Sequence, residues 1–221
     1  YHISRVQEWL DEGDTFPIYV EVGPIGKCNH RCIFCSFDYL GYENPILDTR
    51  VLTERLREMK GLGLKAVMYA GGGEPLLHPK INEIVEFTNL IGIDVSMTTN
   101  GVFLDKFIEE GLRYLTWIRI SLDAGFKDTY AKIHNCKSEA YSLVLSNLKK
   151  MVDQKKANNL GCTVGTQLVL LRMNYQEVIS LASMLRDIGV DYFSVKPYSQ
   201  HPSSKSNVDS NFTYEELENL N

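Results

Sequence analysis

Three cysteines, Cys28, Cys32 and Cys35, lie close together directly after a strand-like run at residues 18–22. Their C-x3-C-x2-C spacing allows three thiolates from a single short loop to bind one metal centre. Zinc sites usually draw on four ligands, often as two cysteine pairs, and this chain has no second pair. Each iron of a cubane cluster takes a terminal ligand, usually a cysteine thiolate. Three cysteines therefore leave one iron open to a substrate or cofactor, which favours catalysis over a purely structural role.

Two further candidate motifs follow the next strand-like runs. The stretch 71–75, GGGEP, follows residues 66–70, and its glycines let the backbone approach a ligand closely because no side chain intervenes. The same stretch can also be a plain tight turn. Thr98 and Asn100 follow the third run and offer hydroxyl and amide groups that suit ribose hydroxyls. The Asn-Gly pair that they lead into is equally common in turns.

The combination of these motifs resembles the radical S-adenosylmethionine (radical SAM) superfamily. The cysteine spacing, with aromatic Phe34 before the last cysteine, resembles the family signature. The glycine stretch looks like the family motif that binds the ammonium group of SAM. Ser121 and Asp123 are similar to the Ser-x-Asp of the fourth strand in many members. The resemblance covers residues 18–198, so it includes most of the chain.

The resemblance implies two cofactors, a 4Fe–4S cluster and SAM, and a set of residues for each. The implied cluster ligands are Cys28, Cys32 and Cys35. The implied SAM-binding residues are Phe34 near the adenine, together with Gly72, Gly73, Glu74, Thr98, Asn100, Ser121 and Gln167. The implied chemistry is reductive cleavage of SAM to a 5′-deoxyadenosyl radical, which abstracts hydrogen from a substrate. The motifs assign no further catalytic side chain.

Several residues near the motifs have weaker interpretations. Lys132 and His134 lie where some members place a basic residue against the SAM carboxylate, although such residues on a surface helix are more often solvated. Asp123 is either structural or substrate-facing. Asn174 is predicted to cap the following helix. His30 lies between two cysteines and is expected to be too close to them in sequence to share an ion comfortably.

Strand-like and helix-like stretches alternate along the chain. The predicted strands are residues 18–22, 66–70, 93–97, 115–122, 163–171 and 192–195. The predicted helices are residues 48–61, 79–90, 104–111, 138–156 and 175–188. This alternation predicts right-handed parallel β/α units and an α/β fold. The resemblance implies a partial (β/α)6 barrel of the TIM type, and the strand count agrees.

The chain divides into three predicted parts. Residues 1–17 form an N-terminal extension, residues 18–200 the radical SAM barrel, and residues 201–221 a linker and the start of a C-terminal segment. The Ser/Asn-rich stretch 203–211 reads as a flexible linker or loop. The helix-like run at the C-terminus suggests that the chain is a truncated form of a longer protein. In the catalytic barrel, polar and glycine-rich signals are expected at the carboxyl ends of the strands.

Composition limits the setting and the partners. A length of 221 residues suits one domain with a hydrophobic core. A formal charge of −5 argues against a broad nucleic-acid-binding surface, and no apolar run approaches the roughly 20 residues of a membrane span. Five cysteines, three of them clustered, do not form the pattern of a secreted disulfide framework, and no signal peptide is visible. We therefore expect a reducing, cytoplasmic setting.

The resemblance is specific for a superfamily and leaves the reaction open. It is similar to the branch that contains molybdenum-cofactor and peptide-modifying maturases, whose members often carry a further SPASM or twitch domain. It implies a low-potential electron donor, flavodoxin or ferredoxin, and a substrate that is a sugar, an aminocyclitol, another small molecule or a peptide. Two alternatives remain. One is a non-catalytic iron–sulfur or zinc protein; the other is an ordinary β/α-barrel enzyme with incidental cysteines, for which Lys196 is the fair candidate for a catalytic lysine.

Overall fold

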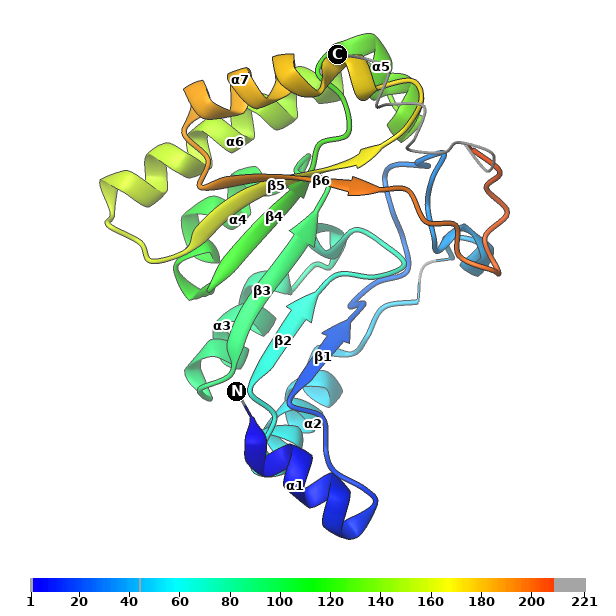
Figure 1. The fold of residues 1–221 in the computed structure, drawn as a ribbon. Coiled ribbons are helices and arrows are strands. Elements are labelled where there is room, and N and C mark those ends of the chain that lie inside the picture. Colours follow the sequence, from blue (N-terminus) through cyan, green and yellow to red (C-terminus); the bar gives the residue numbers. More distant parts are fainter. Residues whose placement is uncertain (1, 44, 209–221) are drawn as a thin grey trace.

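Six parallel strands form one sheet whose order follows the chain, from β1 at one edge to β6 at the other (Figure 1). The structure, a computed structural model, describes residues 2–43 and 45–208. The strands are β1 (Tyr19–Val22), β2 (Ala66–Tyr69), β3 (Asp94–Thr99), β4 (Trp117–Ser121), β5 (Thr163–Leu170) and β6 (Tyr192–Pro197). Because β1 and β6 do not pair, the curved sheet stays open, and the predicted partial (β/α)6 barrel is confirmed.

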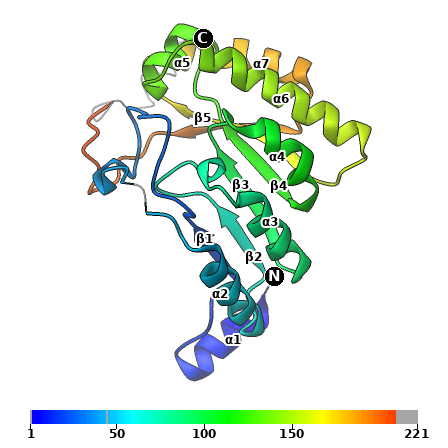
Figure 2. The same ribbon diagram turned by 180° about the vertical axis from the view of Figure 1, so that it is seen from behind.

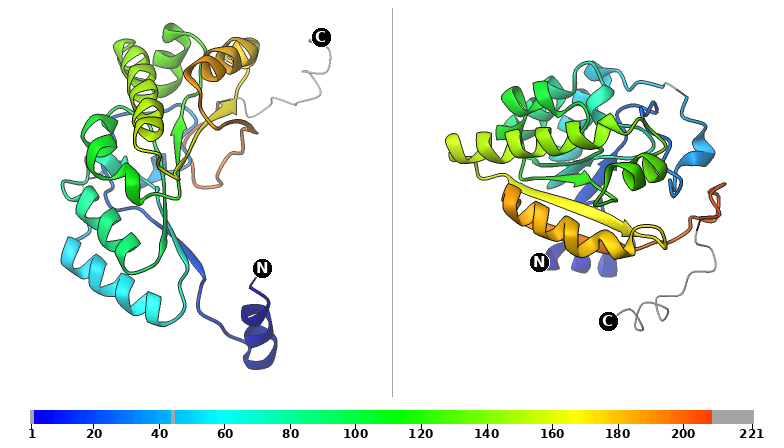
Figure 3. Two further views of the ribbon diagram at one scale, coloured as in Figure 1. Left: turned by 90° about the vertical axis from the view of Figure 1, so that its left-hand side faces the viewer. Right: turned by 90° about the horizontal axis from the view of Figure 1, so that it is seen from above.

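Helices alternate with the strands and cover the outer side of the sheet. The helices are α1 (Ile3–Glu12), α2 (Thr49–Gly61), α3 (Ile81–Leu90), α4 (Leu104–Glu110), α5 (Lys127–His134), α6 (Glu139–Ala157) and α7 (Val178–Ile188). Short 3-10 turns add η1 (Asp38–Leu40), η2 (Pro75–Leu77), η3 (Leu112–Tyr114) and η4 (Tyr175–Glu177). Figure 2 and the left view of Figure 3 show α2, α3, α4 and α6 together on one side of the strands. No helix in the described part of the chain combines the length and apolar character that a bilayer span requires.

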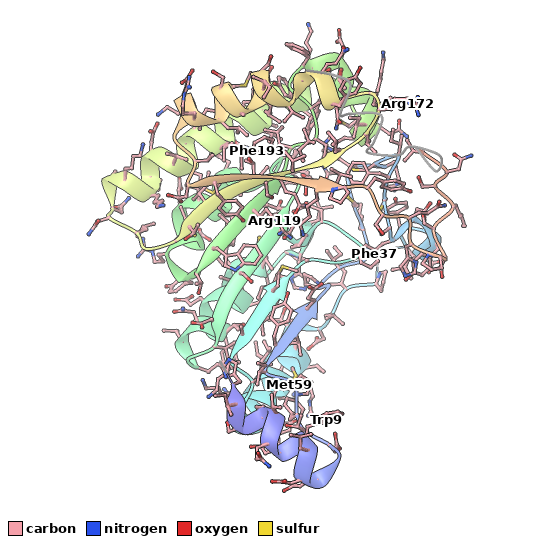
Figure 4. The ribbon with its side chains drawn as sticks, viewed as in Figure 1. Trp9, Phe37, Met59, Arg119, Arg172 and Phe193 are labelled. Carbon is pink, nitrogen blue, oxygen red and sulfur yellow. The ribbon has the colours of Figure 1, made fainter. Side chains whose placement is uncertain are left out.

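Alternation along the strands separates the core from the inner face of the sheet. In β4, Ile118 and Ile120 are fully buried in the core cluster under the helices. Trp117, Arg119 and Ser121 alternate with them and are only partly buried, so they face the inner side. Figure 4 shows Arg119 over the middle strands of the sheet. A side chain on the inner face of β4 therefore points toward the space that the barrel encloses.

Two strands run further than predicted. β3 continues to Thr99, because Thr98 and Thr99 pair with residues of β4, so Thr98 lies within the strand and not after it. β6 continues to Pro197, and Lys196 pairs with Val169 of β5. Hydrogen bonding to a neighbouring strand extends a strand beyond the apolar run that a single sequence reveals.

Two helices start later than predicted, and two were not predicted at all. α3 begins at Ile81 and α7 at Val178, because η2 and η4 precede them as separate 3-10 turns. α1 and α5 are the helices without a prediction. α1 ends at Gly13, which adopts the left-handed conformation, and Arg5 donates a hydrogen bond of 2.7 Å to the carbonyl of Leu62 after α2.

The segment after β6, predicted to be a flexible linker, contacts the cysteine loop as far as the structure describes it. Ser204 Oγ donates to the carbonyl of Cys35 at 3.2 Å, and Ser206 Oγ donates to the carbonyl of Ile33. The backbone N–H of Lys205 lies 3.1 and 2.9 Å from the two carboxylate oxygens of Asp38. Residues 203–208 of the stretch predicted as a flexible linker or loop are thus a loop, and residues 204–206 of it contact the cysteine loop. The predicted C-terminal helix-like run falls on residues 209–221 and lies outside the described residues.

Candidate active site

A cavity of about 310 Å³ opens at the carboxyl ends of the strands, next to the cysteine loop. Its lining residues are Cys28, His30, Cys32, Phe34, Cys35, Ser36, Phe37, Ala70, Gly71, Gly73, Glu74, Thr98, Thr99, Asn100, Ser121, His134, Gln167 and Val169. Every predicted site residue except Gly72 is in this set. A larger hollow of about 470 Å³ lies on the helical side among Leu77, Asn82 and Phe103, and it contains none of the motif residues. We therefore place the chemistry in the smaller cavity.

The cysteine loop is fastened on two sides. On one side, the backbone N–H of Glu74 donates to the carbonyl of Lys27 at 2.9 Å. On the other side, the backbone N–H groups of Arg31 and Ile33, which flank Cys32, donate to the last turn of α5. These bonds hold the loop between the glycine stretch and α5. The three sulfurs are thereby presented to one cavity from a short segment whose backbone is held in place.

The thiols have the properties of a ligand set for a positively charged centre. All three are free and partly buried. Burial raises the pKa of Cys28 and of Cys32, and the neighbouring cysteine and carboxylate charges raise it further. The backbone N–H of His30 lies 3.4 Å from the Cys28 sulfur. Its hydrogen bond stabilises the thiolate and so acts to lower the pKa of Cys28, against the effect of burial. Ionised thiols here require a cation to compensate them, so the donor set fits an iron–sulfur cluster.

Glu74 joins the glycine stretch to the end of β3. Its buried carboxylate accepts hydrogen bonds from Thr99 Oγ1 at 2.6 Å, the backbone N–H of Asn100 at 2.8 Å and the backbone N–H of Leu76 at 3.1 Å. Burial raises the pKa of Glu74, while these three donors lower it. A carboxylate has about four lone-pair positions, so one remains for a ligand in the cavity.

Gly73 and Gly72 have different surroundings. A Cβ on Gly73 would lie 2.2 Å from the carbonyl oxygen of Ile25 and 2.6 Å from that of Lys27, so only glycine allows the stretch to pack against the cysteine loop. Gly72 lies outside the cavity, where a Cβ would lie 2.8 Å from Leu40. The cysteine loop and the glycine stretch thus approach each other backbone to backbone.

Adjacent strands supply polar side chains to the cavity floor. Ser121 of β4 and Gln167 of β5 are register partners on the inner face. Gln167 Oε1 is buried without a hydrogen-bond partner among the described residues. Asn100 donates through Nδ2 to Asn29 Oδ1 at 2.7 Å, which ties the end of β3 to the cysteine loop. A buried amide oxygen without a donor is expected to meet one from a ligand or water.

The structure adds His134 and Asp123, whose connection the sequence analysis missed. His134 Nδ1 lies 3.3 Å from Cys32 Sγ, and His134 Nε2 lies 3.2 Å from Asp123 Oδ2. Both side chains are about 1% exposed, so the expectation of a solvated His134 is wrong. Lys132 is exposed as expected. A signal was present in the sequence, because Tyr130, Ile133 and His134 share one face of a short helix.

Asn174 also has a role that differs from the prediction. Its side chain makes no cap hydrogen bond at η4, so the predicted helix cap is wrong. Instead its Oδ1 accepts from the backbone N–H of Leu171 at 2.8 Å, and its Nδ2 donates to the carbonyls of Asp123 at 2.8 Å and Val169 at 2.9 Å. Asn174 thereby holds the end of β4 against the end of β5, and with it the loop that carries Asp123.

His30 belongs to a second group of side chains that could bind a metal ion, together with Cys32 and His134. Ligand atoms of His30, Cys32 and His134 all lie within 4.8 Å of one another. These distances would allow His30 and Cys32 to share an ion, which the sequence analysis did not expect to be comfortable. Burial, followed by the charge of His134, lowers the pKa of His30 to about 3, and its Nδ1 has no partner among the described residues. A neutral imidazole of this kind can ligate a metal or donate a hydrogen bond.

Comparison with known proteins decides the family. The family model described as the radical SAM superfamily matches residues 22–192. This chain belongs to the radical SAM superfamily. It is therefore an enzyme domain whose cofactors are a 4Fe–4S cluster and S-adenosylmethionine, as the resemblance implied.

Relatives and solved structures agree with this assignment. The chain is 28% identical over 192 residues to the GTP 3′,8-cyclase of Chlorobaculum tepidum, a match that covers 83% of this chain and 55% of that protein. It is 27% identical to an S-adenosylmethionine-dependent nucleotide dehydratase of Lacinutrix mariniflava, over 72% of this chain and 33% of that protein. The structure of Streptococcus suis SuiB bound to S-adenosylmethionine superposes with a TM-score of 0.77 at 18% identity, covering 99% of this chain and 49% of SuiB. The chain thus spans about half the length, or less, of these three proteins.

Proposed function

We propose that this chain is a radical SAM catalytic core in which Cys28, Cys32 and Cys35 hold the cluster and the adjoining cavity binds SAM. When bound, the cluster supplies an electron that cleaves SAM and yields a 5′-deoxyadenosyl radical, which removes a hydrogen atom from the substrate. One observation carries the proposal. Three free thiols from one loop line the same cavity as the motif residues of β2, β3, β4 and β5.

Each wall of the cavity has its own task in this proposal. Glu74 uses its remaining lone pair to accept from the ammonium group of SAM, while Gly73 keeps the backbone close to the cysteine loop. Thr98 and Asn100 offer polar groups to the ribose, and Ser121 and Gln167 offer theirs from the floor. The two remaining predicted contacts, Phe34 and Gly72, contribute a ring beside the adenine and the shape of the glycine turn. Residues 18–200 together form the proposed core.

The names of the relatives favour one class of substrate over another. The names of both relatives describe reactions of nucleotides, so nucleotides are the first class of small molecule to test, and peptides are the second. The electron is proposed to come from a flavodoxin or ferredoxin. The five free cysteines fit a reducing compartment such as the cytoplasm.

Anaerobic reconstitution tests the proposal directly. The purified chain is loaded with iron and sulfide, both are counted, and 5′-deoxyadenosine is measured after adding SAM and dithionite. We expect about four iron and four sulfide per chain, as a cubane requires, and deoxyadenosine that depends on dithionite. Colourless, iron-free protein after loading, or loaded protein that never cleaves SAM, would contradict the proposal.

A zinc site is the second candidate, and one observation favours it. His30, Cys32 and His134 lie within mutual reach of a single ion. A zinc protein would bind about one zinc per chain, would keep it after removal of the Cys28 and Cys35 thiols, and would lose it with Cys32. The alternative of an ordinary β/α-barrel enzyme has no comparable support, because its candidate lysine, Lys196, is exposed and does not line the cavity.

A further inference from the structure

His134 lies buried between a cysteine sulfur and a carboxylate that come from different parts of the fold. Its Nδ1 faces Cys32 Sγ at 3.3 Å, across 102 positions of sequence. Its Nε2 lies 3.2 Å from Asp123 Oδ2 without the alignment of a hydrogen bond. Histidine and aspartate are both about 1% exposed.

The ring is held in this orientation by packing and by the backbone. Its centroid lies 4.1 Å from that of Tyr130, 5.2 Å from that of His30 and 6.3 Å from that of Phe34. The carbonyls of Ile133 and His134 accept hydrogen bonds from Ile33 at 2.9 Å and from Arg31 at 3.1 Å. Because Ile33 and Arg31 flank Cys32, these bonds fix the distance between sulfur and ring.

The start of α5 is fixed as well, which leaves the helix little freedom to withdraw the ring. Glu177 accepts from the backbone N–H of Gly125 at 2.8 Å and of Phe126 at 3.1 Å, and from Thr129 Oγ1. A carboxylate that accepts from N–H groups at a helix start stabilises that end of the helix. α5 is therefore anchored at both ends, and the contact between His134 and Cys32 is built into the fold.

We propose that His134 is a positioning residue that donates an Nδ1–H hydrogen bond to the Cys32 sulfur and thereby raises the reduction potential of the cluster. This inference rests on the proposed function, which assigns Cys32 as a cluster ligand. Negative charge on a ligating sulfur increases when the cluster gains an electron. A donor aimed at that sulfur therefore favours the reduced form, and hydrogen bonds to cluster sulfurs are an established control of potential. Asp123 Oδ2 lies 3.2 Å from Nε2 on the far side of the ring.

Cys32 is one ligand at which this effect can be tested by substitution. The donor to Cys28 is the backbone N–H of His30, which a side-chain change does not remove. The donor to Cys32 is a side chain. Asparagine places an amide N–H near the position of Nδ1, whereas leucine fills similar volume without a donor.

The experiment compares His134→Leu, His134→Asn and Tyr130→Phe with the parent chain after reconstitution. Iron and sulfide are counted, and the ratio of reduced to oxidised cluster is followed by electron paramagnetic resonance during titration with dithionite, which supplies the electron. The hydrogen bond is made to both forms of the cluster and is stronger to the reduced form, so this difference alone shifts the equilibrium, and at a fixed potential the ratio is expected to fall several-fold in His134→Leu. His134→Asn should recover part of it. Tyr130→Phe, which removes a buried hydroxyl that makes no hydrogen bond among the described residues, should stay within about twofold.

A second measurement covers the case in which His134→Leu does not load. The parent chain, labelled with ¹⁵N in its histidine rings, should show ring-nitrogen coupling to the reduced cluster in pulsed resonance spectra, and His134→Asn should lose the contribution of His134 while that of His30, whose ring also lies near Cys32, stays. A fully loaded His134→Leu with an unchanged ratio, an equal shift in Tyr130→Phe, or no ring-nitrogen coupling from His134 would overturn the inference. If the parent chain binds no iron, the proposed function fails as well. Normal loading and SAM cleavage with no effect of His134 would reject this inference alone.

Discussion

Two cysteines of the loop, Cys28 and Cys32, bring thiols whose burial disfavours the ionised form until a cation arrives. The pKa values of Cys28 and Cys32 are raised by burial first and by neighbouring negative charges second. Metal binding must therefore release protons from these thiols. Because three ligands share one centre, the loss of one is expected to weaken the whole site.

The variant Cys28→Ala tests this expectation at the residue scale. It should bind much less iron and make no deoxyadenosine, while its circular dichroism and melting temperature stay close to those of the parent chain, because Cys28 is not part of the buried core. Cys136→Ala is the matched control, since Cys136 is also a free, partly buried thiol and lies outside the cavity. SAM cleavage retained in Cys28→Ala would count against the ligand assignment.

Glu74 gives a prediction for the pH dependence of stability. Burial raises its pKa above the ordinary value of 4.5, so the folded chain binds this proton more tightly than the unfolded chain. Its contribution to folding is therefore complete below the unfolded pKa and is lost as the pH rises through the folded pKa. The free energy of unfolding of the parent chain should fall relative to that of Glu74→Gln as the pH rises above about 4.5.

Urea unfolding of both proteins at several pH values measures this difference. Glu12→Gln, at an exposed position on α1, is the control and should show no such trend. Glu74→Gln is also expected to be less stable at every pH, by about 1–3 kcal/mol, because one amide nitrogen then faces backbone donors. A difference that grows with rising pH would contradict the assigned direction.

At the scale of elements, the site depends on the contact between the cysteine loop and the glycine stretch. Gly73 permits this contact because any Cβ would overlap the carbonyls of Ile25 and Lys27. Both groups are backbone, so they cannot move aside as the end of a flexible side chain can. Displacing the loop would also displace the thiols.

The variant Gly73→Ala should therefore unfold more easily and load less iron. We expect a loss of about 1–3 kcal/mol in the free energy of unfolding, the usual range for an overpacked site. Gly161→Ala is the control, because nothing lies within 4 Å of its added Cβ, and it should stay within about 0.5 kcal/mol. Equal stability and equal iron content of the two variants would show that the close approach of the loops is unimportant.

At the scale of the whole molecule, the chain after β6 returns to the loop that follows β1. Ser204 and Ser206 donate to carbonyls of the cysteine loop, and the Lys205 N–H donates to Asp38. The Ser204–Cys35 contact joins positions 169 apart in the sequence. This segment lies against the outer side of the loop that carries the thiols, so it is expected to restrict that loop.

Hydrogen exchange tests the role of this contact. Asp38→Ala removes both acceptors of the Lys205 N–H, so amides of residues 201–208 should exchange faster while those of the central strands keep their protection. Asp187→Ala, on the exposed side of α7, is the control and should leave the segment unchanged. Unchanged protection of residues 201–208 in Asp38→Ala would mean that other contacts hold the segment.

Much of the fold could be predicted because its signals are local. The apolar runs around Val67, Val95 and Ile118 predict strands without any knowledge of the strands they pair with. The helices between them imply parallel units. The ends of β3 and β6 could not be predicted, because they depend on hydrogen bonds to β4 and β5. α5 was missed because eight residues with mixed polarity carry a weak helical pattern.

By itself, the sequence determined which groups are available: three thiols spaced for one centre, a glycine stretch, and polar residues at strand ends. These follow from composition and short spacing, which the chain carries before it folds. Only the tertiary structure decided that His134 contacts Cys32 and that residues 204–206 lie on the cysteine loop. It also decided that Glu74 accepts three hydrogen bonds from other residues of the fold. The physical reason is separation along the chain. Contacts between distant positions depend on how helices and strands pack, and no short stretch of sequence encodes that packing.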